Sequence, residues 1–156
     1  MKKRLFILCM IALVAFSFIG CDNNTAEPTG PVPATPEETA IVAKIWAARD
    51  EAVIPVLDEN GNPCIDPETR EYIYKDGVVL SDRYEGEEKV FEFTNVDVFG
   101  DGILLNGTYV PYSSGWLTYG ENTINWDLRN CTEPQKTPVK LNSKDIIIND
   151  QDLNNN

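Results

Sequence analysis

Residues 122–129 constrain the fold more than any other segment, because polar and apolar side chains alternate from Thr123 to Arg129. The apolar members are Ile124, Trp126 and Leu128. This alternation is typical of a strand with one buried face and one wet face. A second β-type segment, residues 116–119, comes just before it, and a short polar turn over residues 119–122 joins the two. The pattern therefore predicts an antiparallel hairpin.

Other short β-type segments lie on both sides of this hairpin. They comprise residues 52–57, 72–80, 89–95, 103–110, 139–141 and 145–148. Pro55 confines the first of them to a sheet edge, because proline lacks the N–H that an inner strand needs. Asp76-Gly77 predicts a two-residue hairpin turn within the second. Gly107 predicts either a turn with Asn106 or a bulge.

One helix is predicted ahead of the strands. Thr35-Pro36-Glu37-Glu38 is a capping box with proline at the first helical position. The helical spacing of apolar residues then continues to about Arg49. No alternation of strands and helices follows. The sequence therefore predicts a mainly β protein, α+β by element count, with an antiparallel meander sheet or a small sandwich and this N-terminal helix packed on it.

The first residues have the pattern of an export signal. Three basic residues precede the almost entirely apolar residues 5–19, a run shorter than the roughly 20 residues of a membrane span. Phe18-Ile19-Gly20-Cys21 resembles the lipobox of bacterial lipoproteins. This resemblance implies a signal peptide over residues 1–20, cleavage before Cys21 and acylation of the Cys21 thiol. Acyl chains would then hold the protein on a membrane of the bacterial cell envelope.

The rest of the chain divides into a tether, one domain and a tail. Residues 21–34 predict a flexible tether because they are polar and contain several prolines. Residues 35–150 predict a single globular domain, and residues 151–156 predict a frayed tail. Without the signal, ten basic and 25 acidic residues remain, a net charge of −15. A surface this acidic repels phosphate backbones, so we expect no nucleic-acid partner.

Histidine is absent from the chain, which excludes Ser-His-Asp and Cys-His catalysis and the usual catalytic zinc sites. Cys64 and Cys131 are the two thiols left beside the anchor. We expect them to form a disulfide in an exported domain, although their spacing alone does not show that they meet. The acidic loop that begins at Asp58 lacks the ligand spacing of a calcium-binding EF-hand, because Thr69 stands at position twelve. We therefore expect no metal and no cofactor.

Two further features are candidates for chemistry or binding. Asp97 and Asp101 lie four residues apart, and paired carboxylates can hydrolyse glycosides, but acidic residues in a Gly-rich segment are far more often turn formers. Tyr112, Trp116 and Tyr119 are predicted to form an exposed aromatic surface, which suits stacking on sugar rings or a protein interface. The alternative for these rings is core filling.

These observations predict a lipid-anchored protein of the bacterial cell envelope that is not an enzyme. We expect a binding or interaction module whose partner is an envelope glycan or a protein. The first alternative is a structural envelope lipoprotein with no small-molecule ligand, and the second is a hydrolase that uses carboxylates. Acidic neighbours of the aromatic surface favour neutral sugars or a basic protein patch over anionic polymers.

Overall fold

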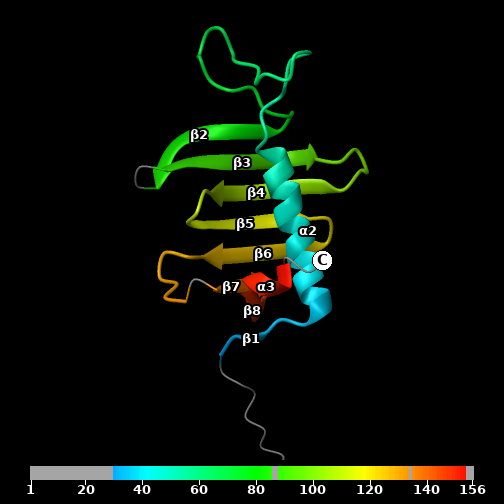
Figure 1. The fold of residues 1–156 in the computed structure, drawn as a ribbon, viewed down its shortest axis with the longest axis vertical. Helices are drawn as coiled ribbons and strands as arrows, with labels where there is room; N and C mark the ends of the chain where they lie inside the picture. The colour runs from blue at the N-terminus through cyan, green and yellow to red at the C-terminus, as the bar shows by residue number, and fades with distance from the viewer. Residues whose placement is uncertain (1–29, 86–87, 134, 154–156) are drawn as a thin grey trace, which may run out of the picture.

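Eight strands of the described chain form one continuous sheet (Figure 1). The structure is a computed structural model that describes residues 30–85, 88–133 and 135–153. The strands are β1 (Val32–Pro33), β2 (Val78–Glu85), β3 (Glu88–Asp97), β4 (Leu104–Val110), β5 (Ser114–Tyr119), β6 (Asn122–Asp127), β7 (Lys136–Leu141) and β8 (Lys144–Asn149). Their order is β1-β8-β7-β6-β5-β4-β3-β2, and all neighbours are antiparallel except β1 and β8. The predicted mainly β meander is confirmed, as one sheet rather than a sandwich.

Helix α2 (Pro36–Ala52) crosses the strands on one face of this sheet (Figure 1). Its start is the predicted capping box. The Thr35 hydroxyl accepts a hydrogen bond from the Glu38 N–H at 3.2 Å, and the Glu38 carboxylate accepts one from the Thr35 N–H at 2.9 Å. The helix ends at Ala52 rather than near Arg49, and a short helix, α3 (Asp150–Leu153), replaces the start of the predicted frayed tail. Within the described residues, neither helix has the length and apolar character needed to cross a membrane.

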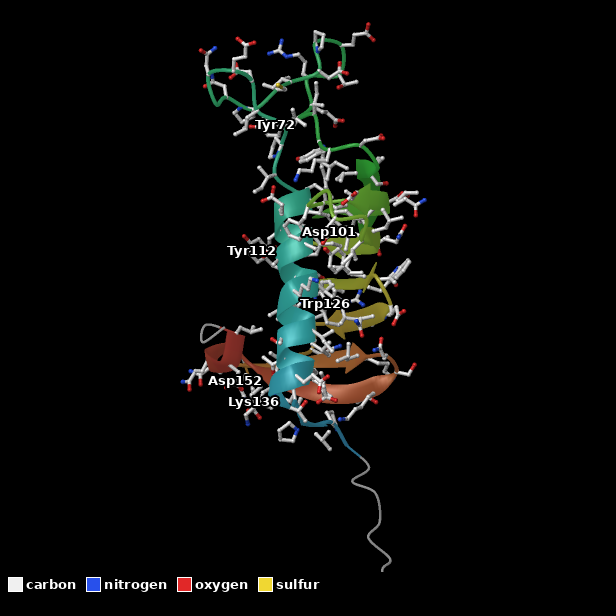
Figure 2. The ribbon with its side chains drawn as sticks, turned by 90° about the vertical axis from the view of Figure 1, so that its right-hand side faces the viewer. Tyr72, Asp101, Tyr112, Trp126, Lys136 and Asp152 are labelled. Atoms are coloured by element: carbon white, nitrogen blue, oxygen red, sulfur yellow. The ribbon has the colours of Figure 1, made fainter. Side chains whose placement is uncertain are left out.

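The core lies between α2 and the sheet face that the helix covers. Val42, Ile45 and Ala48 supply the helix side of this core. The strand residues with almost no exposed area are Leu105, Leu117, Ile124, Ile146 and Ile148. Removal of these apolar side chains from water is the main force that holds α2 on the sheet. In the described part of the chain, no helix covers the opposite face (Figure 2).

The segment between α2 and β2 differs from the sequence prediction. Residues 52–57 do not form an edge strand, because the helix continues into them and only Leu57 makes an isolated bridge. The predicted turn at Asp76-Gly77 is present, because the Val78 N–H donates a 3.1 Å hydrogen bond to the Lys75 carbonyl. Residues 72–75 do not form a strand beside residues 78–80, however, and β2 pairs with β3 instead. Residues 53–77 form a loop that extends past the β2 edge of the sheet (Figure 1).

The N-terminal boundary also differs from the prediction. β1 lies within residues 21–34, the predicted tether, and Val32 pairs with Ile146 of β8. The Ala34 N–H extends this pairing with a 3.0 Å hydrogen bond to the Ile147 carbonyl. The fold therefore starts a few residues before the predicted boundary. The predicted signal peptide and the lipidation site at Cys21 lie outside the described residues.

Candidate functional site

The sheet face opposite α2, called the open face below, carries a row of mostly polar side chains around one exposed tryptophan. The row consists of direct cross-strand partners from β3 to β8, which are Glu92, Thr108, Trp116, Asn125, Lys140 and Asp145. Direct partners have Cβ atoms roughly 4.5–5.5 Å apart on the same face. Trp116 therefore has a hydroxyl neighbour on β4 and an amide neighbour on β6.

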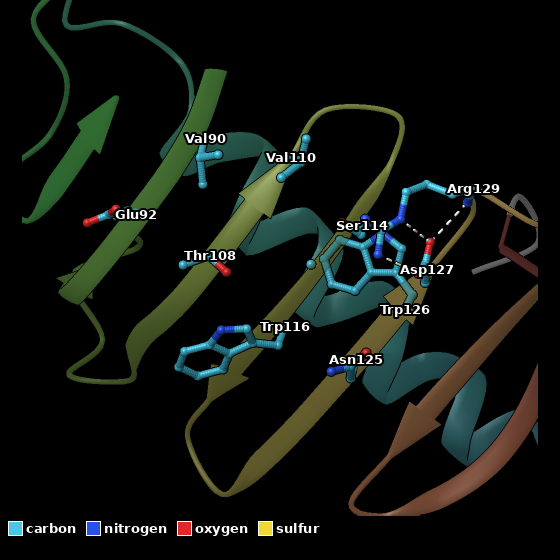
Figure 3. A pocket seen from close by; sticks show the side chains of 11 residues that line it. Val90, Glu92, Thr108, Val110, Ser114, Trp116, Asn125, Trp126, Asp127 and Arg129 are labelled. Atoms are coloured by element: carbon cyan, nitrogen blue, oxygen red, sulfur yellow. Dashed lines mark hydrogen bonds and ion pairs between the residues drawn. The ribbon is translucent and has the colours of Figure 1, made fainter. Parts of the chain in front are cut away.

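Trp116 lines a hollow of about 340 Å³ in the open face (Figure 3). Trp116 is 45% exposed, which is unusual for the largest apolar side chain. Thr108 and Asn125 lie beside its indole, and Asp127 and Arg129 lie toward one end of the hollow (Figure 3). This site, called the Trp116 hollow below, combines an accessible aromatic surface with hydrogen-bonding groups.

Asp127 and Arg129 form an ion pair at that end of the hollow. The Arg129 Nε donates to one carboxylate oxygen of Asp127 at 2.9 Å, and Nη2 donates to the other at 2.7 Å. The Arg129 backbone N–H donates a third hydrogen bond at 3.0 Å. These hydrogen bonds lower the pKa of Asp127 to about 2. The carboxylate therefore stays ionised, and its charge is balanced by the guanidinium beside it.

We expect the Asp127 carboxylate to titrate near pH 2, and to return toward its ordinary pKa of 3.8 in the Arg129→Ala variant. Because the folded pKa lies below the unfolded value, the pair favours the folded state above the unfolded pKa, and this contribution disappears as the pH falls through about 2. Carboxyl carbon chemical shifts measured by NMR at about pH 3 test this, because ordinary aspartates are mostly protonated there. Equal protonation of Asp127 in the two proteins would contradict it.

The three aromatic residues predicted to form one surface do not lie together. Trp116 is on the open face, but Tyr119 is only 4% exposed and lies in the core on the α2 side. Residues three apart on a strand face opposite sides of the sheet, which separates these two rings. Tyr112 is 93% exposed in the turn between β4 and β5, and it projects on the α2 side of the sheet (Figure 2). The predicted joint surface is therefore wrong, and only Trp116 belongs to the hollow.

Sequence reasoning missed the polar partners of Trp116. The signal for one of them was present, because the predicted turn sets Tyr119 opposite Asn122 and hence Trp116 opposite Asn125. Thr108 on β4 depends on the register of a second hairpin, whose turn was not identified. The Asp127 and Arg129 pair depends on side-chain conformations that alternation does not specify.

The expected disulfide is not formed in the structure, where both cysteines are free. Cys64 lies in the loop beyond β2, whereas Cys131 lies in the connection between β6 and β7, and these segments are far apart in Figure 1. The Cys131 thiol donates instead to the carbonyl groups of Glu133 and Lys136, at 3.4 and 3.3 Å.

The acidic residues singled out in the sequence hold turns. Asp97 and Asp101 each accept a hydrogen bond from a backbone N–H in the turn before β4, at 3.2 and 3.0 Å. Asp58 accepts two such bonds at 2.8 Å, and the one from Asn62 is the main reason that the Asp58 pKa lies below its usual value. Among the described residues, no three or more Asp, Glu, Cys or His side chains gather in a way that could hold a metal ion.

A second hollow, also of about 340 Å³, lies between α2 and the turn from β5 to β6. Ile41, Lys44 and Tyr119 are among the residues that line it. The Tyr119 ring is already covered there, with the Lys44 Nζ 5.5 Å from its centroid. It offers little aromatic surface to a ligand, whereas the Trp116 indole is accessible. The Trp116 hollow is therefore the stronger candidate.

Comparisons with known proteins do not assign a family. The chain matches no protein-family model, no curated protein and no solved structure.

Proposed function

We propose that the protein is a lipid-anchored, non-catalytic binding module of the bacterial cell envelope, and that the Trp116 hollow is its ligand site. The observation that carries this proposal is the exposure of Trp116 among polar cross-strand partners. A large apolar ring that remains in water loses the stabilisation that burial provides. Such rings are also the side chains that most often dominate binding energy when a ligand covers them.

The N-terminal sequence supports the anchor. The lipobox-like Phe18-Ile19-Gly20-Cys21 implies acyl chains at Cys21, and more than one acyl chain gives stable membrane attachment. Ten residues separate Cys21 from β1, and an extended segment of that length reaches roughly 35 Å. β1 is at the edge of the sheet, so a tether that joins there leaves the central Trp116 accessible.

The chemistry of the hollow supports binding rather than catalysis. Histidine is absent from the whole sequence. The Asp127 carboxylate, whose pKa is lowered to about 2 by Arg129, carries no proton to donate near neutral pH and is too weak a base to accept one efficiently. Asp97 and Asp101, the other carboxylate pair considered, hold a turn. A purely structural lipoprotein would leave the exposed Trp116 without a role.

The anchor and the site are tested with separate substitutions in the full chain. In cells, Cys21→Ser should abolish the incorporation of labelled palmitate that the parent protein shows. The unacylated Cys21→Ser protein should co-sediment with delipidated envelope material from a bacterium that produces the protein. Adding Trp116→Ala should weaken that co-sedimentation by roughly tenfold or more.

Tyr112→Ala is the matched control, because Tyr112 is an exposed ring outside the hollow. It should leave co-sedimentation unchanged. Equal palmitate incorporation by Cys21→Ser and the parent protein would overturn the anchor, and equal co-sedimentation of the Trp116→Ala and parent proteins would overturn the site.

A further inference from the structure

We propose that the ligand of the Trp116 hollow is a neutral saccharide, with one sugar ring stacked on the Trp116 indole and its hydroxyl groups bonded to Asn125, Thr108 and Asp127. This inference rests on the proposed function and names the ligand class of the same site. It follows from the mixture of groups in the hollow, from their charge and from its shape.

The mixture of groups matches the two surfaces of a sugar ring. A pyranose has an apolar face of C–H groups, which packs on an aromatic ring, and an edge of hydroxyl groups that both donate and accept hydrogen bonds. Trp116 supplies the flat surface, and its partners Thr108 and Asn125 stand beside it on the neighbouring strands (Figure 3). A hydroxyl and an amide are both donors and acceptors, so they suit hydroxyl groups in either direction.

Asn125 and Asp127 retain hydrogen-bonding capacity toward the hollow. No interaction joins the Asn125 amide to the other residues that line it (Figure 3). The Asp127 carboxylate oxygen that receives the Arg129 Nη2 takes only that one hydrogen bond from Arg129, whereas the other oxygen takes two. A carboxylate oxygen can accept about two hydrogen bonds. The Arg129 pair therefore fixes an acceptor in place and leaves it able to bind a hydroxyl group.

The charge of the hollow excludes anionic ligands. The positive charge of Arg129 is balanced by the Asp127 carboxylate. Farther along the row, the Lys140 Nζ lies 3.4 Å from a carboxylate oxygen of Asp145. The 25 acidic residues of the chain outnumber the 13 basic ones, so phosphate and sulfate polymers are repelled. This argues against nucleic acid, although bases also stack on aromatic rings.

The shape and polarity of the face favour a sugar over an apolar small molecule or a protein. Sites for apolar small molecules cover most of the ligand, commonly about 70–90% of its surface, whereas this hollow lies on one face of the sheet and leaves the Trp116 side chain 45% exposed. Protein interfaces need roughly 800 Å² on each partner with a core depleted of charge. The row that contains Trp116 has charged side chains at Glu92, Lys140 and Asp145. A saccharide can bind to an open hollow with charged side chains nearby, because the outer edge of the sugar remains hydrated.

The test uses the full-length Cys21→Ser protein and defined probes. Calorimetric titrations would compare neutral oligomers of glucose, mannose, xylose, galactose and N-acetylglucosamine with anionic galacturonate oligomers and heparin fragments. We expect saturable binding of at least one neutral oligomer and none of the anionic ones. Trp116→Ala should weaken this binding by roughly tenfold or more, Trp116→Phe and Asn125→Ala should each weaken it by a smaller factor, and Tyr112→Ala should leave it unchanged.

Circular dichroism of each variant checks that the variant is folded. If Trp116→Ala does not fold, the loss of binding is measured on Trp116→Phe and Asn125→Ala instead. Preference for anionic probes, or neutral binding that none of the hollow variants weakens, would overturn the saccharide proposal. Failure of all neutral probes while envelope material still binds through Trp116 would overturn the ligand class and leave the proposed function intact. Failure of both would overturn both.

Discussion

Trp126→Ala is expected to lower the free energy of unfolding by about 3–5 kcal/mol, the usual cost of truncating a buried tryptophan. Trp126 is only 4% exposed. Its ring lies 6.3 Å from the Trp46 ring of α2 and 6.3 Å from the Tyr109 ring of β4, measured between centroids. Removal of this indole would leave a cavity at the contact between helix and sheet, because backbone elements cannot close such a gap fully.

Arg49 makes this contact more than an apolar one. Its guanidinium lies 4.7 Å from the centroid of the Tyr109 ring and 5.9 Å from that of Trp126. A cation over aromatic faces adds roughly 0.5–2 kcal/mol. Trp126→Ala therefore removes apolar contacts and one of the rings that hold a helix cation, so we expect a loss toward the upper end of the range.

Trp116→Ala is the matched control for this prediction, because Trp116 and Trp126 are the same residue type on neighbouring strands but on opposite faces. Its unfolding free energy should change by less than about 1 kcal/mol. Urea denaturation followed by circular dichroism gives both values. Similar losses for the two variants would contradict the structure, since they would mean that the open face is covered.

The sequence alone predicts a helix or strand correctly where one short segment determines that element. The capping box at Thr35 and the alternation of residues 122–129 are local, and both reappear in the structure. The prediction of an edge strand over residues 52–57 was wrong, because an apolar, β-branched run of this length is compatible with either a strand or the end of a helix. The burial of Ala52 in the core favours the helix end. β1 was not predicted, because a strand of two residues that pairs with a strand distant in the sequence leaves no periodic pattern.

In the candidate site, too, local features can be predicted from the sequence, whereas features that depend on strand alignment cannot. The sequence predicts an exposed Trp116, but its grouping with Tyr119 is wrong, because residues three apart on a strand face opposite sides of the sheet. This separation follows from the spacing of the two residues in the sequence itself. The positions of Thr108 and Glu92 were not accessible, because they depend on how β3, β4 and β5 are aligned. That alignment includes a bulge near Asn95, whose N–H donates to the Asn106 side chain at 2.8 Å, where the sequence suggested a turn or bulge at Gly107.

Gly107→Ala is expected to lower the free energy of unfolding by at least about 2 kcal/mol, because it combines backbone strain with a steric clash. Gly107 has a φ of +130°, and a Cβ atom there would lie 2.1 Å from the Trp116 carbonyl oxygen and 3.0 Å from the Leu117 Cα. β4 and β5 would have to separate at the strand that carries Trp116, so saccharide binding should weaken as well.

Gly100→Ala is the control that separates backbone strain from the steric clash. Gly100 also has a positive φ, +72°, but a Cβ atom there would meet nothing within 4 Å. It should cost only the roughly 1–2 kcal/mol of left-handed backbone strain, and it should leave the Trp116 hollow intact. Urea denaturation of both variants, with the NMR signal of the Trp116 indole as a local probe, tests the difference. Equal losses of stability, or an unchanged indole signal in Gly107→Ala, would show that β4 and β5 do not approach each other as closely as the structure places them.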